Sequence, residues 1–501
     1  MSRSSRLTLS IGIPCALLLG AGLLILPNRH ASLSASTVPP AKVQAPAKPV
    51  APDPNAPAAV APPGTILYTA KKGDTVPGLL HKYLWQSTYM TAPEFEAAIR
   101  ERNDNFKGVF LKAGTNYIIP GMEGLPTTEK SIPVPRDYEV RAIYLTGLMA
   151  ASPKGVEIVK QWRKVGGNAV VFDIKDSDGW VNIPWDNVLE PPMNHQPYIK
   201  NLVKYTHFLH SMGMHAIARE AIFRDEALVV KHPELAVHSR KSGDPWRENG
   251  KLVWTDPSNP TVQAYDIALA KHATESGVDE VQFDYVRFPA EGDQKDAKFH
   301  YEGDHPKWQR TDVITDFLHK AYGELHPTGV LLSIDVFGVM AWQRNVDLAH
   351  TGQDIPNMAK NCDVMSPMIY PSHFFGMDGY ADPGDAPEHF IGESMDRFRL
   401  ITKDTNVVLR PWLQAFAWRT KTYSPEYIQV QVATSKSKGG VGFLFWNARN
   451  DYSKPYVAMP EMAKNSEKYI RGDEFNKLPK PVEAPAAAPV ATATKAAVPG
   501  R

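Results

Sequence analysis

Eight apolar runs that alternate with amphipathic segments limit this chain's fold more than any other feature of the sequence. The runs have the length and composition of buried strands, and the segments between them repeat apolar positions at the three- and four-residue spacing of helices. Alternating strands and helices form parallel sheets with crossover helices, and eight such units close a (β/α)8 TIM barrel. The runs are residues 140–147, 169–176, 215–223, 278–286, 330–338, 362–371, 407–416 and 441–448, and the predicted helices include 154–165, 198–211, 262–275, 313–324 and 425–437.

A doubly wound open sheet is the main alternative for such an alternation. That fold needs fewer strands and usually carries a glycine-rich phosphate turn, which no first strand-to-helix junction here supplies. The chain has 501 residues, of which 43% are hydrophobic, so it can bury a large core and also hold a smaller domain. We therefore predict an α/β protein, with a (β/α)8 TIM barrel over residues 138–475 and a small N-terminal α+β domain.

The most informative strand end is the sequence Val-Gln-Phe-Asp-Tyr-Val-Arg-Phe-Pro at residues 281–289. Residues 281–283 read as a buried strand, and Asp284 and Arg287 lie where the chain emerges from it. The carboxyl ends of the strands carry the chemistry in TIM barrels, so a carboxylate at this point is a candidate for catalysis. The structural alternative is an ion pair between Asp284 and Arg287 that only anchors a loop.

The other strand ends add carboxylates, arginines and aromatic rings to the same predicted rim. Charged side chains are rarely buried unless they are paired or functional, so packing alone does not explain the pattern. A sugar substrate explains it, because carboxylates accept hydrogen bonds from hydroxyls and two acids can divide the roles in glycosidic cleavage. The rim residues are Asp173, Lys175, Asp176, Arg219, Glu220, Tyr285, Asp335, Met368, Tyr370, Trp412, Gln414, Trp446 and Asn447.

Three carboxylates are predicted to divide the catalytic roles. Asp284 is the expected nucleophile or stabilising carboxylate, and Arg219 or Arg287 would keep it ionised. Asp335 on the next strand is the first choice for the general acid, and Glu220 is the second choice. Retaining hydrolases hold their two carboxyl groups about 5 Å apart and inverting ones about 6.5 to 9.5 Å apart, which the sequence does not decide. A role for Asp335 in capping the loop after its strand stays open.

The remaining rim residues are predicted to bind the substrate. Tyr370, Trp412 and Trp446 present flat faces to sugar rings, although packing at the rim explains them equally well. Asp173 and Lys175 would hold a substrate hydroxyl or support Asp284. The predicted substrate-binding set is Asp173, Lys175, Arg219, Tyr285, Arg287, Tyr370, Trp412, Gln414 and Trp446.

Composition and motifs argue against several other functions. Lys plus Arg total 55 and Asp plus Glu total 54, so no excess of positive charge attracts nucleic acid. The sequence has no Gly-x-Ser-x-Gly elbow and no His-Glu-x-x-His motif, and Cys15 and Cys362 are not placed to form a disulfide. His207 and His210 lie three residues apart on one predicted helix, where they are expected to face solvent and an adjacent loop rather than to hold a metal. We expect no metal and no cofactor.

The first 30 residues have the pattern of a signal peptide or a membrane anchor. Arg3 and Arg6 precede an apolar stretch over residues 7–27, which is nearly long enough to span a bilayer. The basic start keeps the N-terminus cytoplasmic, so the domains are predicted outside the cytoplasmic membrane, anchored to it or secreted after cleavage. Pro and Ala dominate residues 31–64, a predicted semi-rigid linker, and residues 476–501, a predicted disordered tail.

Residues 65–121 are predicted to fold as a separate unit, with a strand, a turn, two helices and a closing strand. The positions that match a known motif are Tyr68, Gly73-Asp74-Thr75, Asn103, Leu111-Lys112-Ala113-Gly114 and Ile118-Ile119-Pro120. With them the unit resembles the lysin motif, LysM, which implies binding to N-acetylglucosamine-containing glycans such as peptidoglycan. Residues 83–93 depart from the motif, because they are longer than the family pattern and carry Trp85 and Tyr89. Residues 122–137 form a connector to the barrel.

The predicted barrel carries four runs that match one family: Arg141-Ala142-Ile143-Tyr144-Leu145-Thr146, Asn168-Ala169-Val170-Val171-Phe172-Asp173-Ile174-Lys175, Phe283-Asp284-Tyr285-Val286-Arg287-Phe288-Pro289 and Ser366-Pro367-Met368-Ile369-Tyr370-Pro371. With these runs the chain resembles, over roughly residues 140–452, the "putative glycosyl hydrolase domain" family, domain of unknown function 4015. That family is allied with TIM-barrel glycoside hydrolases. The resemblance therefore implies a TIM barrel and a reaction class, the hydrolysis of O-glycosyl bonds.

Substrate-assisted cleavage of the chitinase type is disfavoured. Such chitinases end their fourth strand in Asp-x-Asp-x-Glu, whereas Asp284 is followed by Tyr285 and Val286 with no Glu two residues on. We predict a glycoside hydrolase that acts on a cell-envelope or extracellular polysaccharide with a carboxylate pair at the barrel rim. The competing prediction is a non-catalytic envelope scaffold that binds a glycan. The expected partners are the polysaccharide, peptidoglycan through the LysM-like domain and a membrane through the N-terminal segment.

Overall fold

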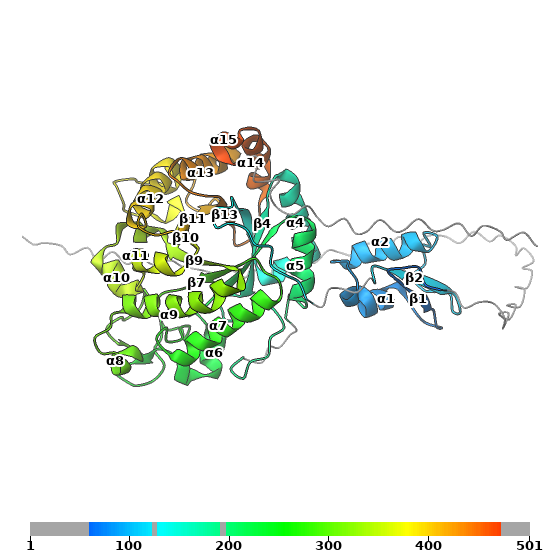
Figure 1. Cartoon of the computed structure of the whole chain (residues 1–501), viewed down its shortest axis with the longest axis horizontal. Coiled ribbons are helices and arrows are strands. Elements are labelled where there is room, and N and C mark those ends of the chain that lie inside the picture. The colour runs from blue at the N-terminus through cyan, green and yellow to red at the C-terminus, as the bar shows by residue number, and fades with distance from the viewer. Residues whose placement is uncertain (1–59, 123–127, 191–196, 472–501) are drawn as a thin grey trace, which may run out of the picture. The chain divides into compact units, whose positions relative to one another are not determined.

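The computed structural model describes residues 60–122, 128–190 and 197–471 (Figure 1). The predicted signal or anchor, most of the Pro/Ala linker and the predicted tail lie outside the described residues. Within the described ranges, no helix combines the length and the apolar character that crossing a membrane requires. The described residues form a small N-terminal unit and a larger barrel.

The small unit consists of β1 (Thr65–Thr69), α1 (Val76–Tyr83), α2 (Ala92–Arg102) and β2 (Asn116–Pro120). The two strands pair antiparallel, and each helix begins at a threonine cap, Thr75 or Thr91, whose hydroxyl accepts a backbone N–H. Phe95, Ile99 and Ile119 are fully buried in the unit's own core. This order of strand, helix, helix and strand is the one predicted for residues 65–121, while glycan binding stays a prediction.

The barrel is closed by eight parallel strand positions, which confirms the predicted (β/α)8 TIM barrel (Figure 1). Around the barrel, β3 is followed by β4, β5, β7, β9 and β10. Next to β10 lie β11 and β12, which share one strand position, and β13 then pairs with both β12 and β3. Each strand except the seventh is a single segment. The strands are β3 (Arg141–Leu145), β4 (Ala169–Lys175), β5 (His215–Ala221), β7 (Glu280–Asp284), β9 (Leu331–Phe337), β10 (Val364–Ile369), β11 (Val408–Leu409), β12 (Trp412–Gln414) and β13 (Phe443–Trp446).

The seventh strand differs from its prediction, because residues 407–416 form two short strands rather than one. Pro411 lies between β11 and β12 and has no N–H to donate to the ladder. The chain keeps its place in the barrel nonetheless. Arg410 N donates to the carbonyl oxygen of Met365, and Pro411 accepts a hydrogen bond from Leu444 N.

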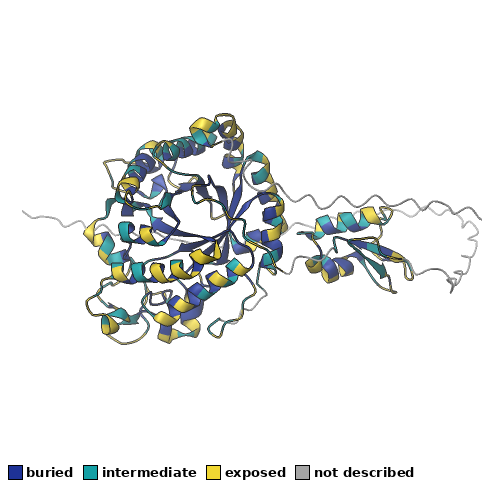
Figure 2. Ribbon diagram, in the orientation of Figure 1, coloured by how far each residue is buried: buried dark blue, intermediate teal, exposed yellow. Residues whose placement is uncertain are grey.

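Helices surround the barrel, and most of them bury one face against it. Figure 2 shows dark blue residues on the strands and yellow, exposed residues on the outer helix faces. Several helices begin with proline in the first turn, and two of these, α4 and α13, follow a serine cap, Ser152 or Ser424. The helices are α3 (Gly147–Ala150), α4 (Pro153–Val165), α5 (Leu202–Ser211), α6 (Glu226–Lys231), α7 (Pro260–Glu275), α8 (Tyr301–Asp304), α9 (Arg310–Leu325), α10 (Asn345–Thr351), α11 (Ile355–Met358), α12 (Pro387–Ile401), α13 (Pro425–Ser437), α14 (Ser453–Lys464) and α15 (Ser466–Tyr469).

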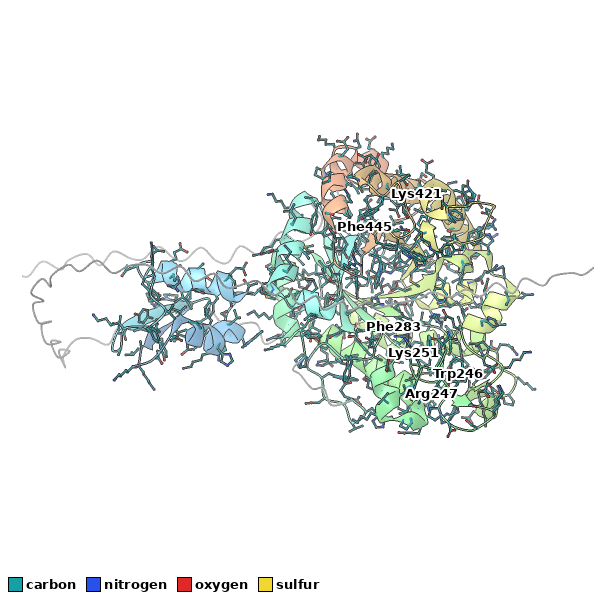
Figure 3. The ribbon with its side chains drawn as sticks, turned by 180° about the vertical axis from the view of Figure 1, so that it is seen from behind. Trp246, Arg247, Lys251, Phe283, Lys421 and Phe445 are labelled. Carbon is teal, nitrogen blue, oxygen red and sulfur yellow. The ribbon has the colours of Figure 1, made fainter. Side chains whose placement is uncertain are left out.

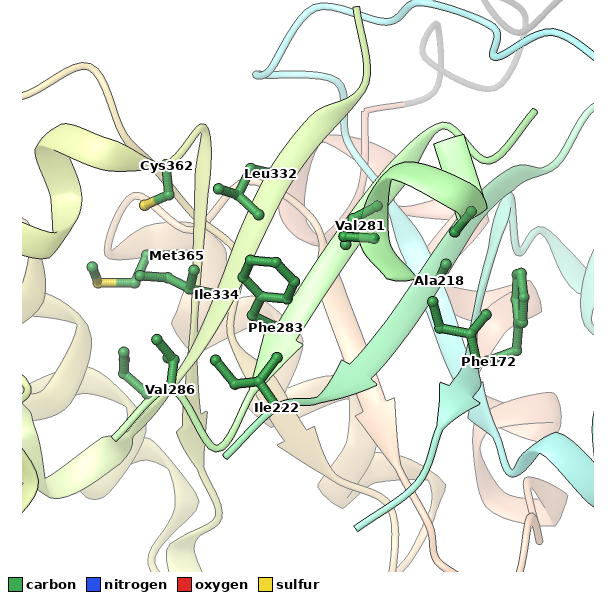
Figure 4. Packing of buried hydrophobic residues seen from close by; sticks show 14 of the residues in the cluster. Phe172, Ala218, Ile222, Val281, Phe283, Val286, Leu332, Ile334, Cys362 and Met365 are labelled. Carbon is green, nitrogen blue, oxygen red and sulfur yellow. The ribbon is translucent and has the colours of Figure 1, made fainter. Parts of the chain in front are cut away.

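Side chains of successive strand residues alternate between two separate cores. Phe283, Ile334 and Met365 share one register row across three strands and pack in the layer between strands and helices (Figure 4). Tyr144 and Trp412 belong to a smaller cluster of residues inside the barrel. The inward-facing residues at the carboxyl ends of the strands are therefore the ones that meet.

Two long connections, from β5 to α7 and from β7 to α9, each contribute one strand to a two-stranded ribbon, β6 (His238–Ser239) with β8 (Ala297–Lys298). Trp246 and Lys251 of the first connection are labelled in Figure 3. The Trp246 ring is buried, and its indole N–H donates to the carbonyl oxygen of Asp293 at 3.2 Å. A surface cavity of about 530 Å³ lies between the two connections and is lined by residues that include Arg240, Phe299 and Arg310.

Candidate active site

Arg219 joins carboxylates from three other strands at the carboxyl end of the barrel. Its Nη1 donates to Asp173 Oδ1 at 2.6 Å, and its Nη2 donates to Asp284 Oδ2 at 2.5 Å. Its Nε lies 3.8 Å from Asp335 Oδ2. All four side chains are largely buried. One cation therefore faces three carboxylates, so the local charge is negative unless a carboxylate takes up a proton.

The strand register places Asp284 and Asp335 side by side. Phe283 on β7 pairs with Ile334 on β9, and each aspartate is the next residue of its strand. Neighbouring strands lie about 4.8 Å apart, and residues in the same register row point to the same face. Both carboxylates consequently face the interior of the barrel, next to Arg219.

Asp335 is the more deeply buried member of this pair. Its side chain is 1% exposed, and its Oδ1 accepts a hydrogen bond from the indole Nε1 of Trp412 at 2.7 Å. Burial and then the charge of Asp284 raise the pKa of Asp335 well above its usual value, although Arg219 opposes this. Burial and its neighbours thus favour the protonated form of Asp335.

Asp284 is the more accessible member, with 11% of its side chain exposed. Its Oδ1 accepts a hydrogen bond from the backbone N–H of Tyr285 at 2.6 Å. Tyr285 has a φ of 56°, in the left-handed region that non-glycine residues rarely adopt. Backbone strain of this kind costs about 1 kcal/mol or more and persists where the surrounding structure holds it, often at functional sites.

Tyr144 on β3 extends the cluster and was not singled out by sequence reasoning. Its hydroxyl donates to Asp173 Oδ2 at 2.5 Å, and its ring stacks on Trp446 with 4.1 Å between centroids. The Arg219 guanidinium lies over both rings, 5.5 Å from Tyr144 and 5.3 Å from Trp446. Burial raises the pKa of Asp173, while Arg219 and Tyr144 oppose the shift. The inward alternation of β3 residues was the available signal for Tyr144.

Asp176, just after β4, is a further titratable group near this cluster. Burial and the charge of Asp173 raise the pKa of Asp176 to about 6. Its Oδ1 accepts hydrogen bonds from the N–H groups of Asp178 and Trp180, and the residue remains partly exposed. A carboxyl group that titrates near neutrality can act as a general acid or base.

The predicted aromatic and amide residues divide between the site and its supports. Trp446 is half-buried beside Arg219, whereas Trp412 is buried and holds Asp335. Burial raises the pKa of Tyr370 well above its usual value, and the charges of Asp335 and Asp284 add to this effect. Gln414 is fully buried and bonds to the backbone of two neighbouring connections, accepting from Ser372 N. Gln414 therefore holds loops rather than facing the site.

Lys175 and Glu220 do not lie with the other predicted site residues. Lys175 Nζ lies 2.8 Å from Asp225 Oδ2 and 2.8 Å from Asp266 Oδ1, in a buried cluster on the helix side of the strands. Burial alone would lower the pKa of Lys175, but the two aspartates raise it. Burial and then Asp266 raise the pKa of Glu220 well above its usual value. Neither Glu220 oxygen has a hydrogen-bond partner among the described residues.

Arg287 stacks among aromatic rings instead of pairing with Asp284. Its guanidinium carbon lies 4.6 Å from the ring centroid of Phe337 and 4.8 Å from that of Trp254, with Tyr285 at 5.4 Å. Across the described ranges, Arg287 makes no ion pair. The loop-anchoring pair that the sequence left open is therefore not formed.

Among the residues described, no group of His, Cys, Asp or Glu is arranged to hold a metal ion.

The closed parallel barrel brings carboxylates from neighbouring strands together at its carboxyl end, as TIM-barrel glycoside hydrolases do. Residues 142–452 match the family model described as "Putative glycosyl hydrolase domain", and the chain belongs to that family. No curated protein sequence matches the chain.

Several solved structures are similar to this chain. A hypothetical protein from Ruminiclostridium thermocellum ATCC 27405 is 35% identical, with 39% of this chain and 97% of that chain covered and a TM-score of 0.32. The PgaB (BpsB) glycoside hydrolase domain from Bordetella bronchiseptica is 16% identical, covers 64% of this chain and 99% of its own, and gives a TM-score of 0.48. The spore cortex-lytic enzyme SleL from Bacillus megaterium QM B1551 is 12% identical, with 78% and 85% covered and a TM-score of 0.38.

Proposed function

We propose that the protein hydrolyses glycosidic bonds in a cell-envelope or extracellular polysaccharide. The observation that carries the proposal is the pair Asp284 and Asp335, which lie side by side on neighbouring strands and share Arg219. Glycosidic cleavage needs one ionised carboxylate and one proton-bearing carboxyl group. Membership of the glycosyl hydrolase family supports the same reaction class.

Burial and ion pairing support one division of the two roles. Asp284 is the more exposed group and bonds directly to the Arg219 guanidinium, which favours its ionised form as the nucleophile or stabilising carboxylate. Asp335 carries the raised pKa that a general acid needs. In the retaining mechanism Asp284 bonds to the anomeric carbon as the acid protonates the leaving oxygen. Water, deprotonated by the same acid group, then breaks the glycosyl-enzyme bond and restores both side chains.

Asp176 replaces Glu220 as the second choice for the acid, because Glu220 lies apart from the site and Asp335 is only 1% exposed. The spacing of adjacent strands, about 4.8 Å, is close to the carboxyl separation of about 5 to 5.5 Å in retaining enzymes and favours Asp335. The pKa of about 6 and the partial exposure of Asp176 favour that residue instead. The two assignments can be distinguished by experiment, because each predicts that a different variant, at Asp335 or at Asp176, loses acid catalysis.

The segments outside the barrel suggest where the substrate lies. The LysM-like unit would bind N-acetylglucosamine-containing glycans such as peptidoglycan, and the N-terminal segment would anchor the domains outside the cytoplasmic membrane or direct their secretion. Together these features favour a substrate in the cell envelope over a soluble sugar.

The decisive experiment compares the wild type with Asp284→Asn on sacculi, chitin oligomers and glucosamine- or galactose-based exopolysaccharides. We expect the wild type to release reducing ends and the variant to lose this activity by about a thousandfold or more while it still binds. Equal glycan binding with no product from either protein would instead support a non-catalytic scaffold.

A second comparison identifies the acid. Loss of the general acid impairs cleavage of poor leaving groups far more than cleavage of activated aryl glycosides such as nitrophenyl glycosides, which leave without a proton. We expect Asp335→Asn to show this leaving-group dependence and Asp176→Asn to retain wild-type selectivity. The reverse pattern would assign the acid to Asp176.

A further inference from the structure

Two connections at the carboxyl end of the barrel carry aromatic rings that the proposed chemistry does not use. One connection joins β10 to α12, and the other joins β12 to α13. Phe375 on the first is 37% exposed and Trp418 on the second is 39% exposed, with 5.7 Å between their ring centroids. Exposed aromatic rings that cluster beside a functional site are typical of ligand-binding surfaces.

Contacts between the two connections fix the position of these rings. Asp385 accepts hydrogen bonds from the backbone N–H of Lys421, at 2.8 Å, and from that of the next residue. The Lys421 ammonium, labelled in Figure 3, lies 2.6 Å from Asp382 Oδ2. A Cβ atom at Gly384 would lie 2.1 Å from the carbonyl oxygen of Arg419, so the close approach of the backbones requires glycine. A surface held in this way loses little conformational entropy when it binds a ligand.

Arg419 adds hydrogen-bond donors to the two rings. Its guanidinium carbon lies 3.9 Å from the Phe375 centroid and 4.7 Å from the Trp418 centroid. The side chain is exposed and makes no ion pair within the residues that the structure describes. Its N–H groups are therefore available to hydroxyl or carboxylate oxygens of a ligand that rests on the rings.

A chain of ring contacts links this surface to the candidate active site. The ring centroids of Trp418 and His373 lie 4.9 Å apart, and those of His373 and Tyr370 lie 5.4 Å apart. Tyr370 packs in the interior cluster with Trp412, the residue that donates to Asp335. Burial and then Arg419 lower the pKa of His373 to about 4, so its ring is neutral at neutral pH. The rings that connect this surface with the residue next to Asp335 are thus uncharged.

We infer that Phe375, Trp418 and Arg419 form an outer sugar subsite, which binds a further unit of the polysaccharide whose scissile bond lies at Asp284. The inference rests on the proposed function and adds that the enzyme acts within extended glycan chains. Flat apolar faces beside guanidinium donors match a pyranose ring, which presents C–H groups on its faces and hydroxyls on its edge. The ring contacts to Tyr370 favour a glycan over a protein partner as the occupant.

Calorimetric binding to the full-length protein tests the subsite. Asp284→Asn serves as the background because it prevents cleavage, and the ligands are the disaccharide and hexasaccharide of chitin, of its de-N-acetylated form and of peptidoglycan glycan strands. We expect the wild-type surface to bind a hexasaccharide more tightly than the matching disaccharide. Adding Trp418→Ala should weaken hexasaccharide binding by about tenfold and reduce that preference, since it removes one stacked ring.

Two further variants separate the subsite from a general effect on folding. Trp418→Phe keeps a ring and should restore most of the hexasaccharide affinity. Tyr380→Ala removes a ring that is 40% exposed on the same connection but contacts His389 and Phe390 instead, so it should leave the affinity unchanged. The subsite would be overturned if adding Trp418→Ala left the hexasaccharide affinity unchanged. It would also be overturned if the protein bound none of the hexasaccharides. Length-dependent binding without cleavage by the wild type would overturn only the hydrolase function.

Discussion

Arg219 organises the candidate site at the scale of single residues. It donates to Asp173 and Asp284 and lies near Asp335, so its removal would leave three buried carboxylates without their shared cation. Hydrogen bonds from Tyr144 and Trp412 stabilise two of these carboxylates but cannot neutralise them. The charge state of the whole cluster therefore depends on this one guanidinium.

Replacing Arg219 should destabilise the barrel strongly. We expect Arg219→Met to lower the free energy of unfolding by about 3 to 5 kcal/mol at neutral pH, because unpaired buried charges remain. Adding Asp173→Asn should restore part of the loss, since it removes one of those charges. Urea unfolding followed by circular dichroism measures both effects. Glu220→Gln, at the next position of β5 but on its other face, is the matched control and should cost far less.

The backbone of Tyr285 allows a separate test of strain at the site. Its φ of 56° suits glycine better than any residue with a Cβ atom. Both Tyr285→Gly and Tyr285→Ala lose the same ring contacts, so the difference between them isolates the backbone. We expect the Gly variant to be more stable than the Ala variant by about 1 kcal/mol in urea unfolding. An Ala variant that equals or exceeds the Gly variant would show that the conformation carries no such strain.

At the scale of elements, the apolar runs predicted the barrel strands to within a few residues because each strand is buried on both faces. The interruption at Pro411 is the main departure. Carboxyl ends of parallel strands meet, so Asp284 and Asp335 could be placed together from the sequence. The orientation of Lys175 could not, because a register irregularity between Asp173 and Lys175 turns it toward the helix side. Simple alternation, by contrast, already separates Glu220 from Arg219.

A histidine and carboxylate clasp binds the connector to the amino-terminal side of the barrel. His210 on α5 lies 3.1 Å from Glu129 Oε1 in the connector and 3.0 Å from Asp279 Oδ2. Asp279 in turn accepts a hydrogen bond from Ile132 N of the connector at 2.5 Å. Burial alone would lower the pKa of His210, but its hydrogen bonds and charge interactions with Asp279 and Glu129 raise it. The clasp should therefore depend on pH.

The sign of that dependence follows from the raised pKa of His210. Its stabilising contribution is fully present below the unfolded value of about 6.5 and is lost as pH rises through the higher folded value. We expect His210→Gln to lower the free energy of unfolding on the order of 1 kcal/mol at pH 5 and by less at pH 9. His207→Gln is the control, because His207 contacts the same Glu129 but is 46% exposed. Equal losses at both pH values would contradict the clasp.

At the scale of the whole molecule, the chain combines a barrel whose site faces one end with a small unit that has its own buried core. The barrel contains Arg219, its three carboxylates and the aromatic rings from Trp418 to Tyr370. None of these residues comes from the small unit. Under the proposed function, the barrel carries the chemistry and the LysM-like unit would carry attachment to an insoluble polymer. Such a division would let the LysM-like unit raise the local concentration of substrate without a part in the bond-breaking step.

Deleting residues 65–121 tests this division of roles. We expect the shortened protein to cleave a soluble hexasaccharide at a rate within about twofold of the full chain, because the barrel residues that carry the chemistry remain. Co-sedimentation with insoluble sacculi should fall by about tenfold or more, since linked binding sites raise the overall affinity by such factors or greater. An unchanged thermal unfolding midpoint for the barrel is the control for folding. If the shortened protein sediments with sacculi as fully as the intact chain, the barrel itself supplies polymer attachment, and the outer subsite at Trp418 becomes the surface responsible for it.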